Sequence, residues 1–198
     1  MDENIQTFWH QFCKKHKINE NTPVEAWAFG ATRKDADELA SLVDKGIKTA
    51  TTSAYELYGK DEKLPKVSEW SIILDGNAKP VCVIKDVCVE IIPYNLISQE
   101  HAYHEGEGDR SYAYWRKVHD EFFTREYKEH GKAFYPQAPM VCEVFEKNKI
   151  KRRIIACIKL ARNNRYMVKL IPYAKLRTYF SKELTKHEKD GSNELKYF

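Results

Sequence analysis

Residues 46–53 read Gly-Ile-Lys-Thr-Ala-Thr-Thr-Ser and place one amine and four hydroxyls within six residues. A hydroxyl becomes a nucleophile when a nearby base takes its proton, and an amine can be that base if its pKa is lowered. Lys48 and the hydroxyls that follow it are therefore candidates for catalysis or ligand binding. The alternative interpretation is structural: a helix end, a solvated lysine and a threonine-rich strand.

A helix before this segment and a strand after it must position these side chains. The apolar residues Ala36, Leu39, Ala40 and Val43 recur at helical spacing, which predicts a helix over residues 32–45. Thr32 is expected to cap its start, with Asp35 as capping partner, and Gly46 is expected to end it. The β-branched threonines then favour extended backbone.

A second polar segment, Glu105–Ser111, contains two glycines among three carboxylates, and it predicts a flexible acidic loop. Asp109 is expected to be the N-cap of a helix that runs to about residue 130. On that helix Trp115 is expected in the core, while His119 could bond into the core or reach a cleft. His101, His104 and Glu105 form a His-x-x-His-Glu run, but two histidines at this spacing are common by chance, so we predict no metal site and no cofactor.

The remaining patterns predict an α+β fold in which strands and helices alternate without a regular βαβ rhythm. Residues 3–18 have a helical apolar stripe, and a short helix is expected from Ser98 to about residue 104. Asp75-Gly76-Asn77 predicts a hairpin turn. Strands are expected over residues 24–30, 67–74, 79–92, 140–145, 154–160 and 166–171.

Composition is that of a water-soluble globular chain: 198 residues, 42% hydrophobic and 31% charged. No apolar run is long enough to cross a membrane, and the N-terminus has no signal-peptide pattern, so a cytoplasmic location is expected. Five scattered cysteines without a Cys-x-x-Cys pair predict reduced thiols and no structural zinc.

Charge divides the chain unevenly. Residues 151–198 contain 13 basic and 4 acidic side chains, a net charge of +9, whereas residues 1–150 carry −5. We expect an N-terminal helix and link (1–22), a central domain (23–150) and a basic extension (151–198). A basic segment is typical of nucleic-acid contact, although charge gives no specificity. The candidate contacts are Arg152, Arg153, Arg162 and Arg165.

Several separated motifs between Trp27 and Phe145 resemble, in order, those of the ASCH domain family, which belongs to the PUA-like β-barrel group. They are Trp27-Ala-Phe-Gly30, Ala36-Asp-Glu-Leu39, Gly46–Thr51, Leu64–Val67, Pro80–Ile84, Glu105–Ser111, Tyr114-Trp-Arg116 with His119, and Met140–Glu143. The resemblance implies a PUA-like mixed β-barrel flanked by helices, with a cleft that binds RNA or nucleotides.

Small family members that share the Gly-x-Lys-x-x-Thr motif are amidohydrolases that remove the acetyl group of N(4)-acetylcytidine. By that resemblance Lys48 and Thr51 correspond to the catalytic lysine and threonine, and Glu107, or alternatively Glu105, corresponds to the glutamate. Thr49, Arg110, Trp27 and Phe29 are candidate ligand contacts, although a place in a core strand is favoured over base stacking for the two aromatic residues. In a flat strand, residues three apart point to opposite faces, and a carboxylate beside Lys48 would oppose its use as a base.

Two functions are therefore expected as alternatives. The first is an enzyme for a modified nucleoside, and the second is a non-catalytic PUA-like RNA-binding module or a ribonuclease. The natural ligand and the oligomeric state are left open by the residues.

Overall fold

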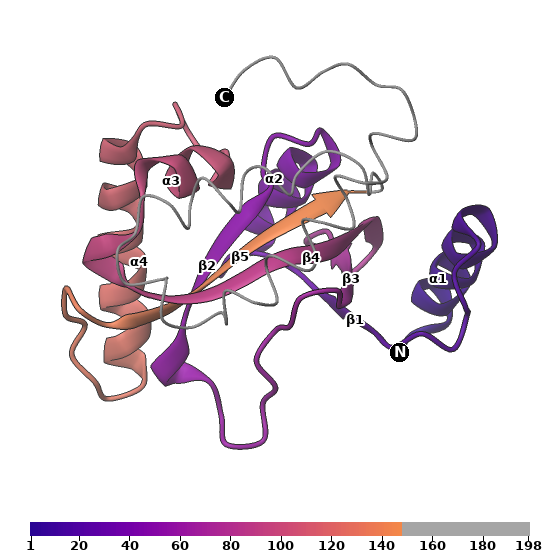
Figure 1. Cartoon of the computed structure of the whole chain (residues 1–198), viewed down its shortest axis with the longest axis horizontal. Helices are drawn as coiled ribbons and strands as arrows, with labels where there is room; N and C mark the ends of the chain where they lie inside the picture. Colours follow the sequence, from indigo (N-terminus) through magenta and orange to yellow (C-terminus); the bar gives the residue numbers. More distant parts are fainter. Residues whose placement is uncertain (148–198) are drawn as a thin grey trace, which may run out of the picture. The chain divides into compact units, whose positions relative to one another are not determined.

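The computed structural model describes residues 1–147, and five strands and four α-helices make up this part of the chain (Figure 1). The elements are α1 (Glu3–His16), β1 (Val24–Trp27), α2 (Arg33–Asp44), β2 (Ala50–Ala54), the 3-10 turn η1 (Tyr55–Leu57), β3 (Trp70–Leu74), β4 (Pro80–Pro93), the 3-10 turn η2 (Tyr94–Leu96), α3 (Gln99–Glu105), α4 (Tyr112–Glu129) and β5 (Pro139–Lys147).

The strands form one mixed sheet in the order β1-β3-β4-β5-β2. Only the β1–β3 pair is parallel; the other three pairs are antiparallel. Within residues 1–147, β1 and β2 stand at the two ends of this order, and the observed pairings do not join them into a closed barrel. The α+β class is thus confirmed at the level of a mixed sheet with helices.

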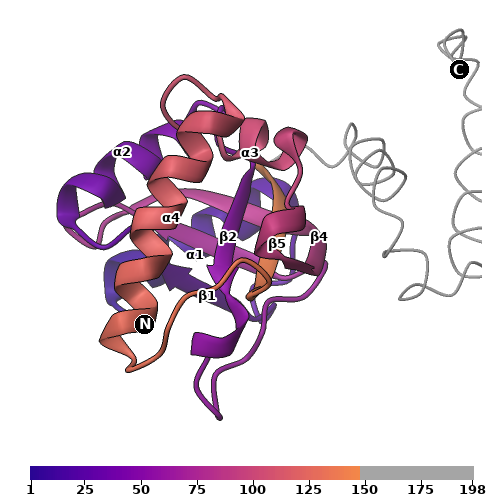
Figure 2. The same cartoon turned by 90° about the vertical axis from the view of Figure 1, so that its left-hand side faces the viewer.

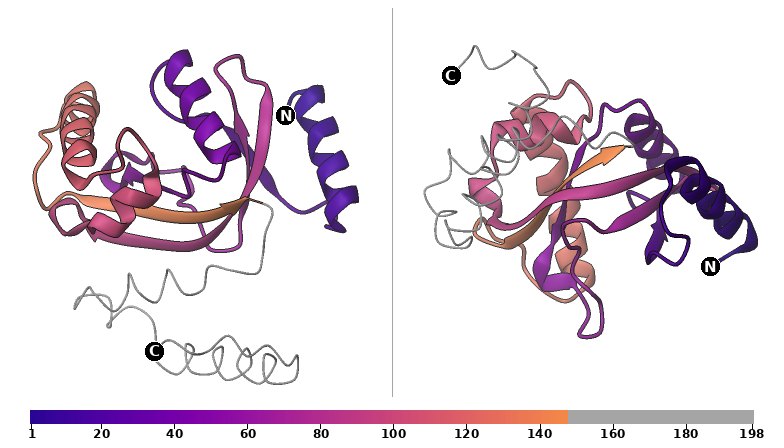
Figure 3. Two further views of the ribbon diagram at one scale, coloured as in Figure 1. Left: turned by 90° about the horizontal axis from the view of Figure 1, so that it is seen from above. Right: turned by 45° about the vertical axis from the view of Figure 1, so that its right-hand side comes forward.

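Helices α1 and α2 pack on opposite faces of the β3–β4 hairpin (Figure 3, left). The α1 side buries Ile72 and Val83, and the α2 side buries Ile73 and Cys82. Adjacent strand residues point to opposite faces, so neighbouring positions serve different cores. The hairpin turn expected at residues 75–77 is present, because the backbone of β3 leads through it directly into β4.

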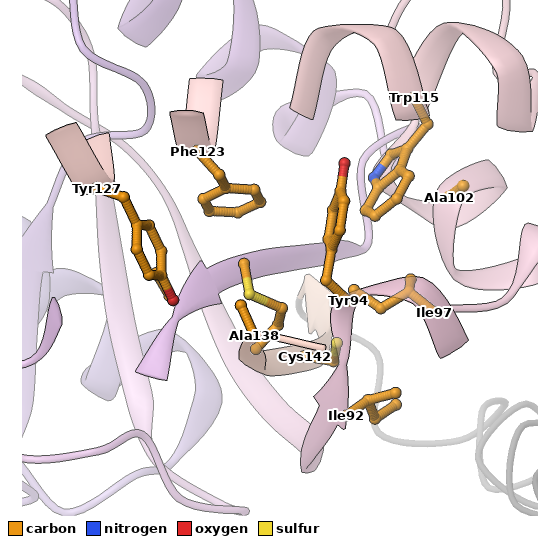
Figure 4. Packing of buried hydrophobic residues seen from close by; sticks show 11 residues of the cluster. Ile92, Tyr94, Ile97, Ala102, Trp115, Phe123, Tyr127, Ala138 and Cys142 are labelled. Carbon is orange, nitrogen blue, oxygen red and sulfur yellow. The ribbon is translucent and has the colours of Figure 1, made fainter. Parts of the chain in front are cut away.

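Helices α3 and α4 lie at the other end of the long strands from α1 (Figures 1 and 2). Aromatic side chains of α4 pack there against β2, β4 and β5 (Figure 4). Trp115, Phe123 and Tyr127 are each at most 2% exposed. Trp115 was expected in the core, and this is confirmed. Its burial fixes the start of α4 against the sheet.

Two of the three N-cap residues predicted for α2, α3 and α4 are confirmed. Thr32 caps α2 in a capping box with Asp35, and Ser98 caps α3. The expectation that Asp109 caps α4 is wrong: Ser111 is the N-cap, and its hydroxyl accepts a hydrogen bond from the backbone N–H of Tyr114. Asp109 instead accepts from the backbone N–H of Ser111, so it orders the turn before the cap.

Strand and helix ends differ from the expected ones by a few residues. The α1 helix ends at His16 because Lys17 adopts a left-handed conformation with φ of 57°. Strand β3 begins at Trp70 and not at residue 67, because Ser68 has φ of 77° and cannot continue a strand. The strands expected over residues 154–160 and 166–171 lie outside the described residues.

Candidate functional site

The Lys48 side chain is buried between two carboxylates that come from residues almost sixty positions away. Its ammonium Nζ lies 3.2 Å from Glu105 Oε2 and 2.8 Å from Glu107 Oε1. Lys48 and Glu105 are each 1% exposed, whereas the side chain of Glu107 is 21% exposed. The structure therefore brings together the lysine and both candidate glutamates, with Glu107 nearer to solvent.

The backbone around this centre is closely packed. Lys48 lies between the end of α2 and the start of β2, and Gly106 follows α3 with φ of 76°. A Cβ atom at Gly106 would lie 2.6 Å from the carbonyl oxygen of Ile47. Only glycine permits both that φ and that contact, so the acidic loop can approach Lys48 this closely.

Glu105 is the most densely bonded side chain of the centre. Its Oε1 accepts hydrogen bonds from Thr52 Oγ1 at 2.6 Å and Trp115 Nε1 at 2.8 Å. His101 and His119 each place a ring nitrogen 3.5 Å from one of its oxygens. A buried carboxylate with this many partners is a fixed anchor, because each lone pair already has a donor or a cation.

The charges of this network reinforce one another. Burial is the largest single effect on Lys48 and Glu105 and disfavours their charged forms, but their charged and hydrogen-bonded partners together outweigh it. The pKa of Lys48 is therefore raised, and the pKa of Glu105 lies well below its ordinary value. Burial lowers the pKa of His119, but the charge of Glu105, its hydrogen bond to the ring and the charge of Glu107 together raise the pKa above its ordinary value. Lys48 is thus held as an ammonium ion, which opposes its action as a general base.

The two neighbouring threonines of β2 point to opposite faces of the sheet. Thr52 is buried and bonds His101 and Glu105, whereas Thr51 is half-buried and lies opposite Glu143 of β5. The structure therefore joins Thr52, and not Thr51, to the hydrogen-bond network of Lys48. Thr52 was not among the site residues predicted from the sequence. Its place next to Thr51 in an expected strand did indicate that the two side chains would point to opposite faces of the sheet.

Thr49 and Arg110 hold the backbone around the centre. Thr49 Oγ1 contacts His104 Nδ1 at 3.1 Å, and its backbone N–H donates to the His104 carbonyl oxygen at 2.8 Å. The Arg110 guanidinium donates to the Ile47 carbonyl oxygen at 3.1 Å and lies 4.4 Å from the centre of the Tyr103 ring. Both residues connect the α3 region to the chain that enters β2.

The aromatic candidates occupy the core beside α2. Phe29 is 6% exposed, and its ring centre lies 5.2 Å from Lys48 Nζ. Trp27 is half-buried and meets Phe29 edge-on at 4.5 Å. Phe29 is therefore covered where base stacking requires an open ring face, and it instead forms an apolar wall behind the ammonium.

Within residues 1–147, no cluster of His, Cys, Asp and Glu side chains is arranged to hold a metal ion. The His101 and Glu105 side chains of the His-x-x-His-Glu run serve the Lys48 network. None of the helices in this part of the chain has the length and apolarity that a membrane-crossing segment needs. The candidate nucleic-acid contacts Arg152, Arg153, Arg162 and Arg165 lie outside the described residues.

Comparisons with known proteins agree with this architecture. The family model described as the ASCH domain matches residues 25–149. The fold is similar to a crystal structure of an ASCH domain from Lactobacillus crispatus JV V101, with TM-score 0.70 and 32% identity over 74% of this chain and 95% of that one. It is also similar to protein EF3133 from Enterococcus faecalis V583, with TM-score 0.66 and 36% identity over 75% of this chain and 94% of that one. No functionally curated protein matches the chain.

The family match spans the helix before Lys48, the acidic loop and all the strands that hold them. The chain therefore belongs to the ASCH domain family.

Proposed function

We propose that this protein binds a nucleoside at the Lys48 centre and hydrolyses the amide of N(4)-acetylcytidine. The observation that carries the proposal is the Lys48 ammonium, which is buried and contacts both Glu105 and Glu107. A desolvated cation of fixed position is suited to stabilise the oxyanion that develops on an amide carbonyl. The resemblance to the ASCH family implies that a ligand cleft lies at this centre.

The charges at the centre favour a division of roles between the three residues. Lys48, held as an ammonium ion, stabilises the oxyanion, and Glu105 keeps it in position. Glu107 is the more exposed carboxylate and takes the proton of the attacking hydroxyl group. Attack of water on the acetyl carbon, cleavage of the bond between that carbon and N4, and proton transfer to the leaving nitrogen yield cytidine and acetate. If the Thr51 hydroxyl attacks instead, cytidine leaves first and a water molecule then hydrolyses the acetyl-threonine ester to acetate.

The test is release of cytidine from N(4)-acetylcytidine by the purified full chain, followed by chromatography. Glu107→Gln should lower kcat by about 100-fold or more, the range of general-base loss. The control Lys45→Met removes an exposed lysine three positions before Lys48 and should keep wild-type turnover. Wild-type turnover in Glu107→Gln would contradict the assigned role, and an inactive wild-type chain would contradict the hydrolase proposal.

The nucleophile is tested by a matched pair of variants. If Thr51 is the attacking hydroxyl, Thr51→Val should abolish turnover with little change in stability. If water attacks directly, Thr51→Val should remain active. Thr52→Val should lower stability in either case, because it removes a donor from buried Glu105.

RNA binding is the second candidate, and the observation that favours it is the net charge of +9 on residues 151–198. Binding through that segment should weaken steeply with salt, because phosphate contacts release counterions. Hydrolysis of a neutral nucleoside should depend much less on salt. Replacing Arg152, Arg153, Arg162 and Arg165 together by Gln should flatten the salt dependence of RNA binding and spare hydrolysis.

A further inference from the structure

His119 of α4 is a buried titratable side chain that takes no part in the proposed hydrolysis. It is 8% exposed and lies one helical turn after Trp115. The Trp115 ring stacks on the imidazole, with centroids 4.3 Å apart and 22° between the ring planes. Trp115 also donates its Nε1 hydrogen to Glu105 Oε1 at 2.8 Å. The imidazole is therefore fixed beside the carboxylate that holds Lys48.

The contacts of the two ring nitrogens determine the protonation state of His119. Nδ1 lies 2.9 Å from the carbonyl oxygen of Trp115, and a carbonyl oxygen only accepts, so Nδ1 carries a hydrogen. The other nitrogen, Nε2, faces Glu105 Oε2 at 3.5 Å. In a neutral ring, Nε2 would direct a lone pair at this carboxylate oxygen. An imidazolium ion places an N–H there instead, so the two contacts together require both nitrogens to be protonated.

The charges of the Lys48 centre favour the same state. Lys48, Glu105 and Glu107 carry a net charge of −1, and a buried charge without a partner is costly. Burial, the largest single effect, and the charge of Lys48 lower the pKa of His119. The charges of Glu105 and Glu107 and the hydrogen bond to Glu105 outweigh them and raise it. The stacked face of Trp115 also favours a cation.

His101 touches the same carboxylate but needs no second proton. Its Nε2 lies 3.0 Å from Thr52 Oγ1, and the Thr52 hydroxyl uses its hydrogen for Glu105 Oε1 at 2.6 Å. A neutral His101 with its hydrogen on Nε2 donates to Thr52 and completes this chain. Of the two histidines beside Glu105, His119 is thus the one whose contacts require a positive charge.

We propose that His119 is a positioning residue of the Lys48 centre, where its imidazolium ion holds Glu105 and brings the formal charge of the four groups to zero. The inference rests on the proposed function, since it names the residue that limits the pH range of that hydrolysis.

The shared oxygen explains how His119 acts through Glu105. Lys48 and His119 both face Glu105 Oε2, so the carboxylate stays anchored when the ammonium turns towards an oxyanion. A centre of net charge −1 would repel that oxyanion, whereas a neutral centre does not. Turnover should therefore fall as pH rises through the titration of His119.

The first measurement is nuclear magnetic resonance of the full chain with isotope-labelled histidine rings, in which His119 is assigned through its backbone signals. At about pH 6.5, where an ordinary histidine is half protonated, His119 should carry a hydrogen on both nitrogens. Glu105→Gln should lower its pKa, because the variant removes a charge that opposes the effect of burial. A ring no more than half protonated at that pH, or an unchanged titration in Glu105→Gln, overturns the inference.

The second measurement is kcat/KM for N(4)-acetylcytidine as a function of pH, which reports the pKa values of the free enzyme. The wild-type value should fall at high pH with the midpoint that the spectrum gives for His119. His119→Gln keeps an N–H donor for Glu105 but carries no charge. Its kcat should be about tenfold or more lower at neutral pH with little change in KM, and the fall at high pH should disappear.

His130→Gln is the matched control. His130 is exposed and has the same type of contact, with Nδ1 2.9 Å from the carbonyl oxygen of Glu126 four residues before it. No contact joins it to the Lys48 centre within the described residues, so the variant should keep the wild-type pH profile.

Three kinetic results overturn the inference and leave the proposed function in place. They are wild-type kcat/KM in His119→Gln, a fall at the same pH in that variant, and a wild-type midpoint that differs from the spectroscopic one. The last comparison uses the wild type alone, so it decides the inference even if His119→Gln does not fold, which circular dichroism verifies. A wild-type chain that does not hydrolyse N(4)-acetylcytidine contradicts the proposed function, and the positioning role fails with it whatever the charge of the ring.

Discussion

Replacing Lys48 by Met should destabilise the fold strongly, because it removes the cation that faces two carboxylates. Removal of one partner of a buried ion pair costs about 3–5 kcal/mol. Glu105 keeps its donors Thr52 and Trp115 in the variant. We therefore expect the loss in free energy of unfolding to lie at the lower end of this range, about 3 kcal/mol. For a chain of this size, 1 kcal/mol shifts Tm by about 2–4 °C, so Tm should fall by about 6–12 °C.

The assay is urea and thermal unfolding of four proteins: wild type, Lys48→Met, Glu105→Gln and the double variant. The double variant has no uncompensated charge at position 105, so it should recover at least half of the stability lost in Lys48→Met. Lys45→Met is the matched control and should unfold like the wild type. The reasoning would be refuted if Lys48→Met cost less than about 1 kcal/mol, or if the double variant were no more stable than Lys48→Met.

Acid titration gives a second readout of the same pair. The folded-state pKa of Glu105 lies well below its ordinary value, so its stabilising effect is present above the unfolded pKa of about 4.3 and is lost as pH falls through the folded pKa. Lys48→Met raises the folded pKa of Glu105. The variant should therefore lose less stability than the wild type on acidification, and equal losses would contradict a strong Lys48–Glu105 interaction.

Three further predictions concern other parts of the described chain. Ser111→Ala should lower the free energy of unfolding by about 1 kcal/mol, and by more than Asp109→Ala does, because Ser111 is the N-cap of α4; equal losses in urea unfolding would contradict this. Gly106→Ala should lower Tm and abolish N(4)-acetylcytidine turnover, since its Cβ would strike backbone at 2.6 Å, and an unchanged melting curve would contradict the close packing. Asp86 and Glu143 have folded pKa values raised to about 7 and about 8, so their stabilising effect is full below the unfolded values near 4 and is lost as pH rises through 7 and 8. The double variant Asp86→Asn, Glu143→Gln should therefore show a flatter stability profile than the wild type between pH 5 and 8 in thermal unfolding.

Local physical rules were enough to predict several elements of this protein from its residues. Thr32 with Asp35, and Ser98, marked helix starts because their side chains satisfy nearby backbone N–H groups. The turn at residues 75–77 marked a hairpin for a similarly local reason. The same kind of signal failed at Asp109, because Ser111 two residues later was an equally good cap and only the path of the loop decided between them.

The chemistry of the Lys48 centre was decided by the tertiary structure. The sequence determined that an amine, hydroxyls and two carboxylates were present, and family motifs indicated that they belong together. Whether Glu105 or Glu107 is the buried partner, and whether Thr51 or Thr52 joins the network, depends on where α3 packs against β2. Burial and charge at that contact are properties of the folded chain, so the protonation of Lys48 and the unpaired oxygen of Asp86 could not be read from residue order alone.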